Sequence, residues 1–310
     1  MMKLIVMIPA YNEEKSIGDV IEEIPRKING VDLVEVLVIN DSSVDNTLEE
    51  AKRAGADRII THKRNLGLGI SFRDGLEEAL DMGADIIVNT DADFQYNGAE
   101  IPRLIDPILM GSADIVIGDR QIETLDHMPS GKVIGNKLAT WVTRYVTALP
   151  IRDAQTGFRA FSRDAALKMN LTGNYTYVQE TLIQAANKNL EVVQIPIEFR
   201  RRSGKSRLIS SLFTYAKSAG TTIVRSYRDY QPFKVFTAIG LFCIIIGFAT
   251  GFRVLLHYLS TGTVTPYLPS AVLTTVLVIV GLQAVVFGLL ADMLRTQRMF
   301  QEEILYRLKK

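Results

Sequence analysis

The stretch DIIVNTDADFQ, residues 85–95, joins a short apolar run to two aspartates spaced one residue apart and then a glutamine. Asp91 and Asp93 follow what reads as a buried strand. Two carboxylates this close repel each other, and a carboxylate at a strand end loses hydration unless a cation compensates it. The alternative is a polar turn, in which aspartate bonds to nearby backbone N–H groups. The surrounding sequence separates these two interpretations.

Apolar, strand-like runs recur on both sides of this stretch and alternate with amphipathic helical patterns. The alternation predicts an α/β fold with a doubly wound, mostly parallel sheet. A later run, EVVQIPIEF at 191–199, also reads as a strand. The predicted strands are residues 4–10, 33–40, 58–62, 85–90 and 114–118, and the predicted helices are residues 14–27, a stretch after Asp45, 69–82 and 99–110.

Polar residues follow three of the predicted strands at the point where each strand ends. They are residues 9–13, 40–43 and 91–95. In sheets of this kind, ligands bind at the carboxyl ends of the strands, so the coincidence weakens the turn interpretation. Paired aspartates at a strand end are then explained by a divalent cation that bridges them to phosphate oxygens. The sequence therefore predicts Mg²⁺ or Mn²⁺, arriving with a diphosphate.

Two other ligand motifs fit the sequence poorly. The glycines of NLGLGIS at 65–71 do not follow the first strand, which disfavours a dinucleotide-binding Rossmann domain. An EF-hand over DADFQYNG fails because the glycine is out of register and no glutamate stands at the twelfth position.

Composition limits the remaining classes of function. The chain has 310 residues, 47% of them hydrophobic, which suggests about two domains with a sizeable core. A net charge of +1 gives no field that would favour nucleic acid as a partner. The single cysteine, Cys243, excludes an intramolecular disulfide and a cysteine-rich metal site.

Two long uncharged runs lie near the C-terminus, at residues 235–252 and 268–291. A bilayer core of roughly 30 Å needs about 20 apolar residues per helix, so both runs are long enough to span it. Buried helices of a soluble protein would carry polar residues on one face, which these runs lack. The sequence predicts two transmembrane helices.

Basic residues predict the orientation of these helices. The connecting loop, residues 257–270, contains no lysine or arginine. Positively charged flanks stay in the cytoplasm, so we expect residues 1–232 and the C-terminus to be cytoplasmic in an integral protein of the cell membrane. The flanking residues are Arg225, Arg228 and Lys234 before the first run, and Arg295, Arg298, Arg307, Lys309 and Lys310 after the second.

Several motifs in order resemble family 2 glycosyltransferases with a GT-A fold. They are IPAYNEE (8–14), INDSSVDNT (39–47), DAD (91–93), GDR (118–120) and DAQTGFRAF (153–161). FRRRSGKSRL (199–208), followed by apolar helices, resembles the dolichol-phosphate mannose synthase group and related polyprenyl-phosphate glycosyltransferases. The resemblance implies a GT-A catalytic domain at 1–208, amphipathic interfacial helices at 209–232, and two transmembrane helices with a cytoplasmic tail at 233–310.

The resemblance also implies roles for individual residues. Asp153 would be a general base or would only position its loop. Arg207 stands where the family pattern has lysine, so a guanidinium fork replaces a point charge. The nucleotide sugar would be bound by Pro9, Ala10, Tyr11, Glu13, Asn40, Asp41, Asp91, Ala92, Asp93 and Gln95; the metal by Asp91, Asp93 and Gln95; the acceptor phosphate by Arg120, Arg201 and Arg207; and the catalytic set would be Asp91, Asp93, Asp153, Arg201 and Arg207.

The activity implied is metal-dependent, inverting transfer of a sugar from a GDP- or UDP-linked donor to a polyprenyl (dolichyl-type) phosphate at the cytoplasmic membrane face. The alternatives are a nucleotide-sugar-binding membrane scaffold and a glycosyltransferase acting on another lipid or glycan. A processive polysaccharide synthase is disfavoured because the only tryptophan, Trp141, is not in a Q-x-x-R-W motif. The sequence leaves open the sugar, the base and whether the chain forms a homo-oligomer.

Overall fold

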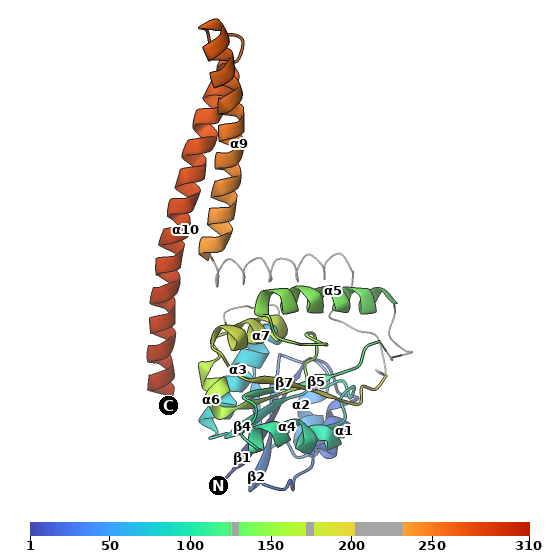
Figure 1. Ribbon diagram of the computed structural model, residues 1–310. Helices are drawn as coiled ribbons and strands as arrows, with labels where there is room; N and C mark the ends of the chain where they lie inside the picture. The colour runs from blue at the N-terminus through green and yellow to red at the C-terminus, as the bar shows by residue number, and fades with distance from the viewer. Residues whose placement is uncertain (124, 126–129, 172–176, 202–231) are drawn as a thin grey trace. The chain divides into compact units, whose positions relative to one another are not determined.

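The computed structural model describes residues 1–310 except 124, 126–129, 172–176 and 202–231 (Figure 1). The chain divides into two compact units, an N-terminal unit that ends at residue 223 and a helical unit over residues 224–308. Each unit has its own packing, and the two units are described separately.

The N-terminal unit is built on one seven-stranded sheet of order β3-β2-β1-β4-β6-β5-β7. β6 runs antiparallel to both β4 and β5, and the remaining pairs are parallel. This confirms the predicted doubly wound, mostly parallel sheet. The strands are β1 (Lys3–Ala10), β2 (Leu33–Asn40), β3 (Arg58–Thr61), β4 (Ile86–Asn89), β5 (Ile115–Asp119), β6 (Arg159–Ser162) and β7 (Val192–Pro196).

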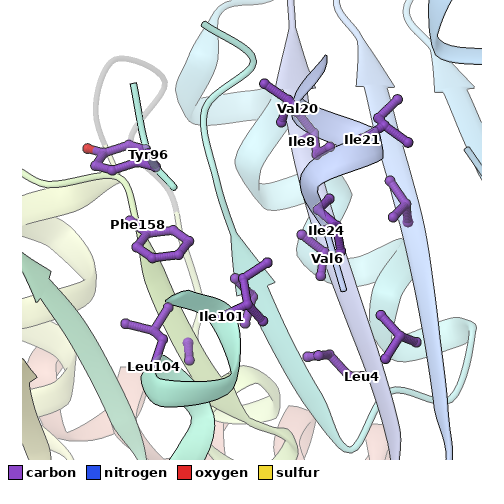
Figure 2. Close-up of a cluster of buried hydrophobic side chains, with 14 of the residues drawn as sticks. Leu4, Val6, Ile8, Val20, Ile21, Ile24, Tyr96, Ile101, Leu104 and Phe158 are labelled. Carbon is purple, nitrogen blue, oxygen red and sulfur yellow. The ribbon is translucent and has the colours of Figure 1, made fainter. Parts of the chain in front are cut away.

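Helices cover both faces of the sheet because successive strand side chains point to opposite sides. On one face, Leu4, Val6 and Ile8 of β1 pack with apolar residues of α1 and α4 (Figure 2). On the other face, Ile5 and Met7 pack with residues of α3, α6 and α7. The helices are α1 (Ile17–Glu23), α2 (Thr47–Arg53), α3 (Leu68–Asp81), η1 (Gly98–Glu100), α4 (Ile101–Leu109), α5 (Ser130–Thr147), α6 (Arg163–Lys168) and α7 (Val178–Asn187).

The first helix is shorter than the sequence predicted. The pattern over residues 14–27 becomes α1, which ends at Glu23. Ile24 is extended, with φ −71° and ψ 119°, because Pro25 follows it and disfavours the helical conformation of the residue before.

The C-terminal unit consists of α9 (Pro232–Thr261) and α10 (Leu268–Lys309). Both are long and apolar enough to cross a membrane, and little of either is buried, which confirms the two predicted long apolar helices. α10 continues well beyond residue 291, where ion pairs one turn apart, Arg298–Glu302 and Glu303–Arg307, support a polar helix. The predicted amphipathic segment 209–232 lies outside the described residues except for its last position.

Close approach of backbones holds α9 against α10. A Cβ added to Gly240 would lie 2.7 Å from the carbonyl oxygen of Gly281, so neither glycine leaves room for a side chain. About two to three turns farther along, the hydroxyls of Thr250 and Thr274 are 2.8 Å apart and hydrogen bonded. Small residues and hydroxyl bonds of this kind are typical contacts between helices in lipid.

Arg159, the first residue of β6, is completely buried and has carbonyl and hydroxyl acceptors instead of a carboxylate. Its guanidinium donates to Thr156 O (2.9 Å), Ala154 O (3.0 Å), Val178 O (2.7 Å) and the hydroxyl of Thr181. Burial lowers the pKa of Arg159 to about 10, which still leaves it protonated at neutral pH. Arg159 therefore ties the loop before β6 to α7.

Replacing Arg159 with methionine should lower the free energy of unfolding by about 3 kcal/mol, because several buried acceptors lose their donor. Thermal unfolding of the full chain in detergent, followed by circular dichroism, measures the loss. Arg152→Met, at an exposed position nearby, is the control and should change stability little. Equal stability of both variants would show that the Arg159 bonds contribute nothing.

Candidate active site

The loops after β1 and β2 are bound to each other at the carboxyl ends of these adjacent strands. Asn12, which has a left-handed φ of 54°, donates its N–H to Ser43 Oγ (3.0 Å) and accepts from Val44 N (2.8 Å). Glu13 N donates to Thr47 Oγ1 (2.8 Å). These bonds gather the residues predicted to bind the nucleoside: Pro9, Ala10, Tyr11, Glu13, Asn40 and Asp41.

Asp41 holds the glycine-rich stretch in place. Its carboxylate accepts from Leu66 N and Gly67 N, both at 2.8 Å, and lies 2.7 Å from His62 Nδ1. The other ring nitrogen of His62 is 3.2 Å from Asp74 Oδ2, off the geometry of a hydrogen bond. Asp41 therefore positions the start of α3, and its contact with the base or ribose stays a prediction.

Asp91 lies against the loop that precedes β6. A Cβ added to Gly157 would lie 2.8 Å from Asp91 Oδ1 and 3.0 Å from the hydroxyl of Tyr177. Asn89 Nδ2 donates to Gly157 O (2.7 Å) and to the Tyr177 hydroxyl (2.9 Å), which fixes both neighbours of the carboxylate. Burial and the charge of Asp91 raise the pKa of Tyr177, so its hydroxyl keeps its proton.

Gly157→Ala should reduce sugar transfer by about 100-fold, because the new methyl group would displace Asp91 and a shift of about 1 Å at a reacting group has an effect of this size. Gly18→Ala is the matched control, since nothing lies within 4 Å of a Cβ there. Initial rates are compared at equal amounts of folded protein. A Gly157→Ala rate equal to that of Gly18→Ala would contradict the placement of Asp91.

Asp93 and Gln95 lie on a tight turn that is hydrogen bonded to Arg200, four residues after the end of β7. Phe94 between them has a left-handed φ of 61°, and Gln95 N donates to Asp93 Oδ1 (3.2 Å). Gln95 Nε2 donates to Arg200 O (3.2 Å), and Arg200 N donates to Gln95 O (2.8 Å). Two of the three predicted metal ligands thus share one turn.

The same contacts distinguish the arginines of FRRRSGKSRL. Arg200 forms two bonds with Glu23, at 3.0 and 2.7 Å, and its guanidinium lies over the Phe94 ring at 4.8 Å from the centroid. Arg200 therefore links the end of α1 to the turn that contains Phe94. Arg201 follows it directly and is exposed, and Arg207 lies outside the described residues.

Arg120 and Asp153 form a buried ion pair with two bonds. Arg120 Nε donates to one Asp153 oxygen at 2.7 Å and Nη2 to the other at 3.0 Å. Burial alone would lower the pKa of Arg120, but Tyr96, Asp153 and Asp91 outweigh it and hold this pKa above its ordinary value. Asp153 is completely buried, so its geometry suits positioning of Arg120 better than proton abstraction.

The donor set fits a divalent cation that is shared with a ligand. No group of three or more His, Cys, Asp and Glu that could hold a metal occurs among the described residues. Asp91, Asp93 and the amide of Gln95 are hard oxygen donors, and Mg²⁺ is ordinarily bound by one or two carboxylates together with substrate phosphates. The residues present therefore fit such an ion.

Several residues of the site were not predicted from the sequence. Tyr96, which accepts from Gly157 N (2.9 Å), and Tyr177 lie next to the predicted aspartates, as does Asn89. Tyr96 follows Gln95 directly, and that adjacency was the one available signal. Tyr177 comes 86 residues after Asp91, immediately before α7, and gives no local signal.

A comparison with protein families matches residues 5–169 to the glycosyl transferase family 2 model. The chain belongs to this family. It is 32% identical over 247 residues to the UDP-N-acetylglucosamine–dolichyl-phosphate N-acetylglucosaminyltransferase of Methanococcus voltae, covering 73% of this chain and 92% of the relative. It is 31% identical over 229 residues to the dolichol-phosphate mannosyltransferase of Pyrococcus furiosus, covering 70% and 62%. This family 2 chain is accordingly a glycosyltransferase.

Solved structures show the same fold. The glucosyl-3-phosphoglycerate synthase of Mycobacterium tuberculosis, in complex with Mn²⁺ and UDP-glucose, superposes with a TM-score of 0.59. The two proteins are 21% identical, and the match covers 73% of this chain and 79% of that one. This similarity confirms the predicted GT-A fold.

Proposed function

We propose that the protein transfers a hexose from a nucleotide diphosphate sugar to a polyprenyl phosphate at the cytoplasmic face of a membrane. One observation carries the proposal. A pair of carboxylates, Asp91 and Asp93, follows β4 at its carboxyl end, and the nearby guanidinium of Arg120, held by Asp153, has its pKa raised in part by the charge of Asp91. The carboxyl edge of the sheet thus combines carboxylates that could hold a metal ion with the guanidinium of Arg120, which is held in place by Asp153. Such a set of charges suits two substrates that both carry phosphate. The names of the relatives, which specify dolichyl phosphate, support the acceptor class.

Asp91, Asp93 and Gln95 would hold Mg²⁺ or Mn²⁺ in this proposal. The ion would supply positive charge to the departing nucleoside diphosphate, which then needs no protonated acid. The Mn²⁺ in the mycobacterial structure of the same fold supports a divalent ion. The residues of the first two loops, from Pro9 to Glu13 with Asn40 and Asp41, would bind the nucleoside.

The acceptor phosphate needs orientation more than activation. A phosphate monoester is mostly dianionic at pH 7, since its second pKa is about 6. Its oxygen attacks the anomeric carbon with inversion, and the bond from that carbon to the nucleoside diphosphate breaks. Asp153, which is buried against Arg120, is not required as a base. Arg120, Arg201 and Arg207 would screen the repulsion between the two anionic substrates.

The apolar helices α9 and α10 would anchor the chain in the membrane as an integral protein. The lysines and arginines that flank them, and the loop between them without any, support a cytoplasmic N-terminal unit and C-terminus. Polyprenyl phosphate resides in the bilayer, so this anchoring brings the enzyme to its acceptor.

A donor panel tests the proposal. The full chain in lipid nanodiscs is incubated with UDP- and GDP-linked sugars, with Mg²⁺ or Mn²⁺, and with or without a polyprenyl phosphate. The panel includes both bases because the relatives use different sugars by name. We expect release of the nucleotide from one donor, dependent on both the lipid phosphate and the metal. Release that is independent of the lipid phosphate would contradict the proposal.

A further inference from the structure

The carboxylate of Asp41 is almost filled by hydrogen bonds from its own chain. Oδ1 lies 2.7 Å from His62 Nδ1 and accepts from Leu66 N at 2.8 Å, and Oδ2 accepts from Gly67 N at 2.8 Å. An ionised carboxylate only accepts, with about four lone-pair positions, two on each oxygen. Both positions of Oδ1 are therefore occupied. Oδ2 keeps one position without a donor among the residues that the structure describes.

His62 is held against Asp41 from several sides. Its backbone N–H donates to Asn40 O (3.0 Å), which ties it to the end of β2. Its second ring nitrogen lies 3.2 Å from Asp74 Oδ2 on α3, and only 10% of the side chain is exposed. Asp74 is itself fixed by Arg73, whose Nε donates to Asp74 Oδ1 at 3.0 Å. The position on Asp41 that His62 occupies is therefore not available to a ligand.

A ligand group that meets the Asp41 carboxylate can thus form one hydrogen bond with it and not two. The pairing edge of guanine offers two adjacent donors, N1–H and the 2-amino group, and a ribose offers two adjacent hydroxyls. Each of these pairs needs both oxygens of a carboxylate. Uracil offers a single donor, N3–H, between two carbonyl oxygens. Of these three groups, uracil alone leaves no donor unpaired at Asp41, and an unpaired buried donor weakens binding by about 10- to 100-fold.

We propose that His62 determines the base of the sugar donor: it restricts Asp41 to one hydrogen bond, which selects a uridine diphosphate sugar over a guanosine diphosphate sugar. The inference rests on the proposed function in one respect, that Asp41 faces the nucleoside. It adds the identity of the base. His62 acts through Asp41 and does not touch the reacting atoms, so it is a positioning residue.

Four nucleotides test the number of hydrogen bonds in the wild type. Isothermal titration calorimetry of the full chain, in detergent with Mg²⁺, measures the dissociation constants of UDP, 3-methyl-UDP, GDP and inosine diphosphate. UDP should bind at least about 10-fold more tightly than GDP and than 3-methyl-UDP, which lacks the N3–H. Inosine diphosphate, which is GDP without the 2-amino group, should bind no more weakly than GDP, because that group has no acceptor at Asp41.

Three results of these titrations would overturn the proposal. They are binding of GDP as tight as that of UDP, equal binding of UDP and 3-methyl-UDP, and a loss of affinity from GDP to inosine diphosphate. The first would show that uracil is not selected, the second that its N3–H is not read, and the third that both donors of guanine are paired.

His62→Phe tests the residue itself, because it keeps an aromatic ring and frees a position on Asp41 Oδ1. We expect the ratio of the UDP and GDP dissociation constants to shift by about 10-fold in favour of GDP. His257→Phe, in α9 and outside the catalytic unit, is the control and should leave this ratio unchanged. An equal loss of affinity for both nucleotides in His62→Phe would show that His62 only supports its loop, which would overturn its role. The wild-type titrations decide the base even where His62→Phe does not fold.

The two proposals fail separately. Transfer of a hexose to polyprenyl phosphate from a GDP-linked donor, with none from a UDP-linked donor, would keep the proposed function and reject the selection of uracil. Selective binding of UDP without any sugar transfer would reject the proposed function and keep the selection of uracil.

Discussion

Asp93→Ala should lower sugar transfer by about 100- to 1000-fold, the usual cost of removing one group that stabilises charge at a reaction centre. Asp93 lies on the turn with Gln95 and would be a metal ligand beside Asp91. Without it, the developing charge on the nucleoside diphosphate loses part of its compensation. Initial rates with a saturating donor, in detergent, measure the loss.

Chelation and a second carboxylate complete this test. EDTA should stop the wild type, and Mg²⁺ or Mn²⁺ should restore it. Asp106→Ala, an exposed carboxylate on α4, is the matched control and should retain wild-type rates. Full activity of the wild type in EDTA would show that the aspartates do not act through a metal.

The second large effect concerns the buried pair Arg120–Asp153. Asp153→Asn should lower stability by about 3–5 kcal/mol, because it leaves the buried guanidinium without its counter-charge. Transfer should also fall by about 100-fold, since Arg120 is no longer held by two bonds toward the site of Asp91. Thermal unfolding and initial rates are measured on the same preparations.

A double replacement separates positioning from stability. Arg120→Met combined with Asp153→Leu removes both charges, and such exchanges of a buried ion pair are often neutral for stability. We expect this variant to regain most of the lost stability while its transfer rate stays low. Recovery of transfer together with stability would show that the pair serves only the fold.

The sheet could be predicted where the sequence pattern is local. β1, β2 and β4 are largely apolar runs, and the polar residues after them mark the ligand edge because parallel strands end there together. β6 was missed as an element because it is four residues long and opens with a buried arginine, Arg159. No local pattern indicates that an arginine will be buried among carbonyl groups.

The charged residues of the site could be predicted from the sequence, but the residues that contact them could not. Asp91 and Asp93 stand out by spacing, but Tyr177 and Gly157 meet Asp91 only through the pairing of β4 with β6. The arginines at 200–202 look alike in sequence, and the contacts of Arg200 with Glu23 and Phe94 become visible only in the structure. Such contacts depend on the fold and not on spacing.

Helix α5 shows a different limit. Its apolar residues have ordinary helical spacing, which predicts a face packed on the core. In the structure the threonines of the opposite face are buried, and the apolar residues Ile134, Leu138, Trp141 and Tyr145 are exposed. Helical spacing predicts that these apolar residues share one face, but not whether that face or the opposite one packs on the core.

The central claim is that the acceptor is a lipid phosphate. The most direct measurement is mass spectrometry of the lipids extracted after the wild type acts on its donor, with polyprenyl phosphate or the unphosphorylated polyprenol of equal chain length. We predict that the polyprenyl phosphate gains one hexosyl group and that the polyprenol stays unchanged. A glycosylated polyprenol, or free sugar beside unmodified polyprenyl phosphate, would contradict the account.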